Sequence, residues 1–128
     1  MSIMLNLISR LEQQTRTISR IQLLRPEVGL TEEQLARIEK YYNLNGVKLS
    51  IGCQLEVIRI YDQGCIFPYE CTINNKNLVV MFASVYEYGE FRIKQDAVCS
   101  ETWFNKLMER DTVTIQNIAV SLFPTLYM

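Results

Sequence analysis

The sequence predicts an α+β fold in which an N-terminal helical hairpin precedes an antiparallel sheet. Three observations lead to this prediction. Apolar residues recur at helical spacing up to about residue 45, they alternate with polar residues from residue 47, and one more helical pattern follows residue 100. We expect a single domain over residues 1–128, with a helical part at 1–45 packed on a sheet-rich part at 46–128.

The first predicted helix covers residues 4–24, where apolar side chains follow a heptad repeat. Pro26 ends it, because the residue before a proline is pushed out of the helical region. Such a helix either packs across the sheet or presents part of its apolar seam to another copy of the chain or to a groove on another protein. The candidate partner-binding residues are the seam positions and two flanking arginines: Met4, Leu7, Leu11, Arg16, Ile18, Arg20 and Ile21.

The second predicted helix begins after Thr31, which has the side chain of an N-cap residue. Gln34, three positions later, completes a capping box, and two glutamates in the first turn suit the positive end of the helix dipole. Gly46 is expected just beyond the end of the helix.

Four to five strands are predicted between residues 47 and 98. Pro68 indicates that the third strand lies at an edge of the sheet or contains a bulge, whereas residues 78–88 are apolar on both faces and should be central. The alternative to an open sheet is that the strands of residues 47–98 close into a small barrel. The strand candidates are 47–51, 54–61, 65–73, 78–88 and 91–94.

One helix and one strand are predicted after residue 98. Ser100 can cap a helix that ends near Asp111, and residues 113–122 are the last strand candidate. The apolar side chains change parity between Ile115 and Ile118, so we expect a bulge there. The apolar tail from Phe123 either docks on the core or binds a partner.

Composition excludes several functions. The 128 residues hold 13 basic and 14 acidic side chains and no histidine, which excludes histidine-based catalysis and histidine metal sites. No apolar run approaches the roughly 20 residues of a membrane-spanning helix. The N-terminus lacks the charged start of an export signal, which indicates a cytosolic protein whose four cysteines are reduced thiols.

Two clusters of side chains are candidates for chemical sites. The four cysteines lack the short spacing of a metal-binding turn, so no metal or other cofactor is expected. Glu87, Glu90 and Asp96 gather around a predicted hairpin and could hold Mg²⁺ in a hydrolase, although clusters of this kind are more often the solvated rim of a sheet.

Aromatic side chains in the strands suggest single-stranded nucleic-acid binding as the main alternative function. They could stack on bases: Tyr61, Phe67, Tyr69, Phe82, Tyr86, Tyr88 and Phe91. Residues 46–128, however, hold seven basic and nine acidic side chains, so the positive charge needed to bind phosphates is missing. We therefore expect a non-enzymatic cytosolic protein, a regulator, adaptor, inhibitor or immunity-type protein of mobile-element or viral kind, that binds a protein partner or itself.

Overall fold

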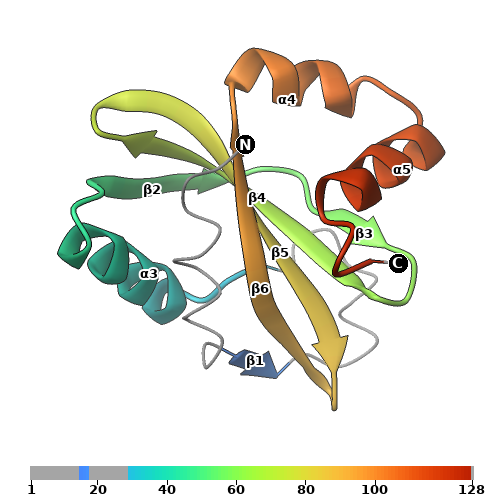
Figure 1. Ribbon diagram of the computed structural model, residues 1–128, viewed down its shortest axis with the longest axis horizontal. Coiled ribbons are helices and arrows are strands. Elements are labelled where there is room, and N and C mark those ends of the chain that lie inside the picture. The colour runs from blue at the N-terminus through green and yellow to red at the C-terminus, as the bar shows by residue number, and fades with distance from the viewer. Residues whose placement is uncertain (1–14, 18–28, 128) are drawn as a thin grey trace.

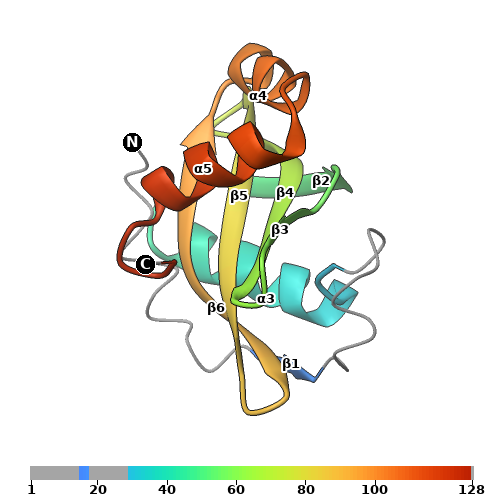
Figure 2. The same cartoon turned by 90° about the vertical axis from the view of Figure 1, so that its right-hand side faces the viewer.

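An antiparallel sheet with helices on both faces forms the centre of the computed structural model, which describes residues 15–17 and 29–127. Helix α3 covers one face, and α4 and α5 cover the other (Figures 1 and 2). The α+β class is therefore confirmed. The strands are β1 (Thr15–Thr17), β2 (Leu49–Gln54), β3 (Ile58–Ile60), β4 (Gly64–Ile73), β5 (Lys76–Glu87) and β6 (Glu90–Cys99), and the helices are α3 (Glu32–Leu44), α4 (Glu101–Met108) and α5 (Thr112–Leu122).

The strand order is β1-β6-β5-β4-β2, and β3 also pairs with β4. Strand β5 lies between β4 and β6, which confirms its predicted central place. Strands β1 and β2 stand at the two ends of this pairing path, so the described strands form an open sheet rather than the closed barrel considered as an alternative.

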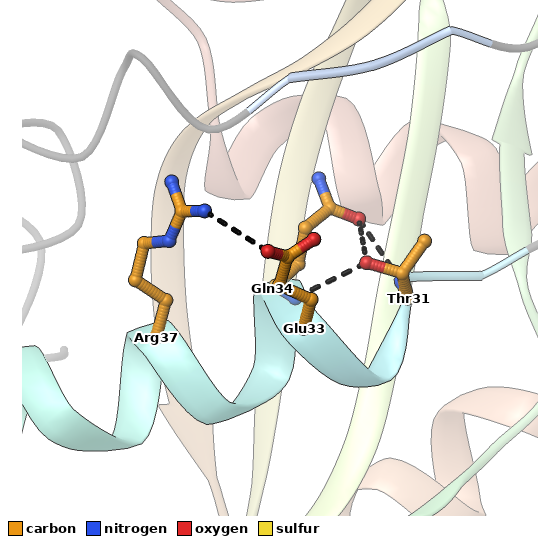
Figure 3. Close-up of polar contacts among 4 residues, drawn as sticks. All are labelled: Thr31, Glu33, Gln34 and Arg37. Atoms are coloured by element: carbon orange, nitrogen blue, oxygen red, sulfur yellow. Dashed lines mark hydrogen bonds and ion pairs between the residues drawn. The ribbon is translucent and has the colours of Figure 1, made fainter.

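Helix α3 begins as its sequence predicts. The Thr31 hydroxyl accepts from the Gln34 backbone N–H at 3.1 Å, and the Gln34 side chain accepts from the Thr31 N–H at 3.0 Å (Figure 3). Glu33 and Arg37 form an exposed ion pair of 3.6 Å on the outer surface. Gly46 follows the C-cap with a φ of +83°, a left-handed conformation in which glycine avoids the steric cost of a side chain.

Both faces of the three long strands are apolar, which explains why helices cover both. Residues of one parity on β4 and β5, such as Phe67 and Phe82, pack with Ile38 and Tyr42 of α3. Residues of the other parity, such as Ile66 and Met81, pack with α4, α5 and the C-terminal segment. Removing apolar surface from water stabilises a fold by roughly 25 cal/mol per Å². These two cores therefore supply most of the driving force for folding.

Pro68 does not mark an edge strand, because β4 has neighbours on both sides. Its carbonyl accepts from the Leu55 N–H at 2.8 Å, so its missing N–H faces the same junction between β2 and β3. The chain opposite it carries one extra residue, because Gln54 pairs with Tyr69 while Ile58 pairs with Ile66. The ladder beside this proline is therefore irregular, but the extra residue lies opposite β4 rather than in a bulge of the predicted strand itself.

The predicted C-terminal strand over residues 113–122 is wrong, because this segment forms α5. Asp111 caps the helix by accepting from the Thr114 N–H at 3.4 Å. The apparent change of parity between Ile115 and Ile118 is helical spacing, which places both against the core beside Ala119. The helix predicted after Ser100 is confirmed as α4.

The first predicted helix, over residues 4–24, is wrong at Thr15–Thr17, which form β1. These three residues pair with Arg92, Phe91 and Glu90 of β6, so tertiary pairing overrides the heptad pattern there. The remainder of the predicted helix lies outside the described residues. Across the part of the chain that is described, no helix is long and apolar enough to cross a membrane.

Candidate functional site

Two turns at one end of the sheet each present an exposed tyrosine. Tyr61 opens the turn between β3 and β4 and is 55% exposed, and Tyr88 opens the turn between β5 and β6 and is 94% exposed. The β5–β6 hairpin projects beyond the rest of the sheet (Figure 2). We call the two turns, Tyr61–Gln63 and Tyr88–Gly89, the tyrosine end.

The backbone holds the two turns together. The Tyr86 N–H donates to the carbonyl of Gln63 at 2.8 Å, which ties the β3–β4 turn to the end of β5. Gly64 makes this close approach possible, because a Cβ atom at that position would overlap the backbone carbonyl oxygen of Ser84. The relative position of the two tyrosines is thus set by hydrogen bonding and by one glycine.

Both tyrosines occupy a backbone conformation that is costly for their residue type. Tyr61 has a φ of 48° and Tyr88 a φ of 52°, in the left-handed region where a side chain costs about 1–2 kcal/mol. The Tyr88 ring is 94% exposed, so its packing offsets little of this conformational cost. Strained residues of this kind are concentrated at functional sites, and exposed tyrosine is enriched in protein interfaces.

Charged side chains of both signs lie beside the tyrosine end. The Glu87 carboxylate lies 3.9 Å from Arg92 and 3.7 Å from Lys94. All three side chains are between about one quarter and one half exposed, so these contacts are worth at most about 1 kcal/mol each. The surface next to the tyrosines is consequently mixed in charge.

The three carboxylates considered for a metal site do not come together. Glu87 pairs with Arg92 and Lys94, whereas Asp96 is fully buried beneath α3 and bonded to Tyr42. The side chain of Glu90 lies outside the described residues. Within the described residues, no group of three histidine, cysteine, aspartate or glutamate side chains could hold a metal ion.

The sequence did not predict the burial of Asp96, because a bulge in β6 changes the face on which this residue lies. Ala83 pairs with Gln95 but Ser84 pairs with Ile93, which leaves Lys94 as an extra residue. If side chains simply alternated between the two faces across this bulge, Asp96 would lie on the face opposite to α3. Burial raises the pKa of its carboxyl to about 7, although the hydrogen bond from Tyr42 acts in the opposite direction.

The four cysteines are free thiols that differ in burial. Burial raises the pKa of the Cys65 and Cys71 thiols to about 12 and that of Cys99 to about 11. A nucleophilic or metal-binding cysteine needs the opposite shift, because the thiolate is the reactive form. Cys53 is exposed on β2.

The aromatic residues divide into a core set and a surface set. Phe67, Tyr69, Phe82 and Phe91 are buried, and they form edge-to-face pairs within the core. Tyr61 and Tyr88 are left as exposed members of the strand aromatics. Tyr61 precedes Asp62 and Tyr88 precedes Gly89 in the sequence. A neighbouring turn residue is the sequence signal that could have distinguished these two tyrosines from the buried aromatic residues.

Most of the partner-binding residues predicted on the first helix lie outside the described residues. These are Met4, Leu7, Leu11, Ile18, Arg20 and Ile21. Arg16 is in β1, where its backbone pairs with Phe91, and its side chain is not described. No protein-family model, curated protein or solved structure matches the chain.

Proposed function

We propose that this chain is a small, non-enzymatic binding protein that acts by contacting a protein partner through the tyrosine end. One observation carries the proposal: Tyr61 and Tyr88 are exposed at the same end of the sheet, in a backbone conformation that lowers folding stability. Tyrosine offers a large contact area and a hydroxyl while losing little side-chain entropy, which suits it to the centre of a protein interface.

The absence of histidine from the sequence and the raised pKa values of the buried thiols support a binding role over catalysis. A regulator, adaptor or inhibitor of another cytosolic protein is the role that we infer. The seam predicted over residues 4–21 is a second contact surface under this proposal, for a partner or for another copy of the chain.

Binding of single-stranded nucleic acid is the alternative, because two exposed tyrosines could stack on bases. The charges favour a protein instead. The Glu87 carboxylate lies close to both Arg92 and Lys94, and Asp62 is exposed within the β3–β4 turn. A nucleic-acid site would need the side chains of Arg92 and Lys94 to contact phosphates, whereas here both lie beside the Glu87 carboxylate.

The test is affinity capture from the native source with the wild-type chain and with a double variant, Tyr61→Ser with Tyr88→Asn. We expect one or a few proteins to be retained by the wild type after nuclease treatment and to be lost with the double variant. A hot-spot pair of this kind should lower affinity by at least about thirtyfold.

The matched control is Leu44→Ser, which removes another large exposed side chain, 76% exposed, at the end of α3. Its partners should be retained as by the wild type. Retained material that disappears with nuclease would favour the nucleic-acid alternative. Equal capture by the double variant would show that the tyrosine end is not the contact surface.

A further inference from the structure

Two side chains of α3 close the outer edge of strand β2. The Ile51 N–H donates to the Glu39 carboxylate at 2.6 Å, and the Asn43 amide donates to the Leu49 carbonyl at 3.3 Å. Ser50, between them, pairs with β4 on the other side. An edge strand otherwise offers such groups to a strand from another chain, so α3 occupies the positions where pairing would begin.

Besides its apolar packing, the helix that closes this edge makes one fully buried side-chain hydrogen bond to the sheet among the described residues. The Tyr42 hydroxyl donates to Asp96 Oδ2 at 2.8 Å, and both side chains are fully buried. The second carboxyl oxygen, Oδ1, is buried without a hydrogen-bond partner among the described residues. An ionised carboxylate usually accepts several hydrogen bonds, so this environment suits the neutral acid better than the anion.

We propose that α3 is a latch over the edge of β2, and that the proton on Asp96 determines how firmly the latch is held closed. When Asp96 is protonated, a neutral acid bonded to Tyr42 fits the apolar core. When Asp96 is ionised, a buried charge that few hydrogen bonds stabilise favours separation of α3 from the sheet. Separation withdraws Glu39 and Asn43 and frees the edge groups of Leu49 and Ile51.

The direction of the pH effect follows from the pKa of the Asp96 carboxyl, which burial raises from 3.8 to about 7. The closed state therefore binds more protons than an open state in which the carboxyl meets water. The stabilisation of the closed state is complete below pH 3.8 and is lost as pH rises through 7. Near neutral pH the closed state has therefore lost most of the stabilisation that the Asp96 proton provides.

The hydroxyl of Tyr42 and the thiol of Cys71 stay protonated through this range. Burial and the neighbouring Asp96 raise the pKa of Tyr42 far above its ordinary value, and burial raises the pKa of Cys71 on β4 to about 12. On β5 the residue paired with Asp96 is Phe82, which is apolar. Glu39 of α3 is bonded to the Ile51 N–H. Among the described residues, Asp96 is the group placed to respond between pH 5.5 and 8.

Amide hydrogen exchange of the full chain tests the latch directly. Protection factors, corrected for the intrinsic dependence of exchange on pH, would be measured at pH 5.5 and pH 8. Given the pKa values of 3.8 and about 7, opening should become about thirtyfold more favourable at pH 8. We expect this fall in protection at the α3 amides and at Ile51, with β4 and β5 protected at both pH values.

Asp96→Asn is the first variant, because the amide carbonyl can still accept from Tyr42 but cannot ionise. Its α3 protection should be the same at both pH values, whereas Glu56→Gln, at an exposed acid outside α3, should behave as the wild type. Equal protection of wild-type α3 at the two pH values would overturn the latch. So would a fall of the same size in Asp96→Asn, or one spread evenly over β4 and β5.

If Asp96→Asn does not fold, Tyr42→Phe provides the test. Loss of the hydroxyl removes the hydrogen bond that favours the ionised carboxylate, so the pKa of Asp96 rises further. Protection of α3 should then fall more steeply between pH 5.5 and 8 than in the wild type. A fall that is unchanged or smaller would contradict the proposal.

Discussion

The turns that join the three long strands have the same backbone form but different residues. Asn74 and Asn75 connect β4 to β5 with φ values of 51° and 67°, and Tyr88 and Gly89 connect β5 to β6 with φ values of 52° and 80°. Asparagine tolerates a positive φ, and both turns match the type I′ form favoured in two-residue hairpins. Only tyrosine is out of place in this set.

The first turn is explained by folding alone. The Asn74 side chain accepts from the Lys48 N–H at 3.1 Å, and its backbone N–H donates to the Lys48 carbonyl at 2.9 Å. Tyr88 occupies the equivalent position of the other turn, with its ring 94% exposed. Folding stability therefore explains the residues of the asparagine turn but not the choice of Tyr88, and this difference supports the proposed contact surface.

The strongest way to break the tyrosine end is Gly64→Ala. The added methyl group would overlap the Ser84 carbonyl oxygen, which is backbone and can move only with β5. We expect the free energy of unfolding in urea to fall by at least about 3 kcal/mol. Gly46→Ala is the control, because Gly46 has a positive φ but no atom near the added carbon, and should cost about 1 kcal/mol. A loss at Gly64 no larger than this would show that the turns are not closely packed.

Placing a tyrosine in the asparagine turn reverses the comparison. Asn74→Tyr puts a ring in the left-handed region and removes the hydrogen bond to Lys48. We expect unfolding to become easier by about 1–2 kcal/mol. Asn77→Tyr, at an exposed position within β5, should be close to neutral because a strand accepts an aromatic residue. If both variants are neutral, backbone strain is not what separates the two turns.

The smallest effect should come from repairing the other turn. Tyr88→Asn creates the Asn-Gly pair preferred in this turn type, so the chain should gain about 0.5–1 kcal/mol in a urea titration. Tyr88→Ala keeps a strained residue and should leave stability within about 0.5 kcal/mol of the wild type. A loss of stability in Tyr88→Asn would mean that the ring does contribute to folding.

The elements that the sequence predicts well are those whose signals are local. The capping box of Thr31 and Gln34, the Ser100 cap and Gly46 beyond the end of α3 each act within a few residues, and each occurs where expected. The strand predicted over residues 113–122 is wrong because the Asp111 cap and the helical spacing of the two isoleucines prevail over the β-branched composition of the segment.

The site depends on long-range geometry that no local pattern contains. The burial of Asp96 follows from the bulge at Lys94, which shows only in the pairing of β5 with β6. The placing of the Tyr61 turn beside the end of β5 follows from the hydrogen bond between Tyr86 and Gln63, 23 residues apart. The sequence marked both tyrosines as aromatic candidates but could not separate them from their buried neighbours.

The C-terminal segment has a consequence for biosynthesis. Tyr127 is 2% exposed, and its hydroxyl donates to the Ser84 carbonyl at 2.6 Å, 43 positions earlier in the chain. The α3 face can assemble once residue 99 has emerged from the ribosome, but the opposite face waits for Tyr127. At about 5–20 residues per second, Ile66 and Met81 remain uncovered for about one to six seconds, an interval in which a chaperone could bind the nascent sheet.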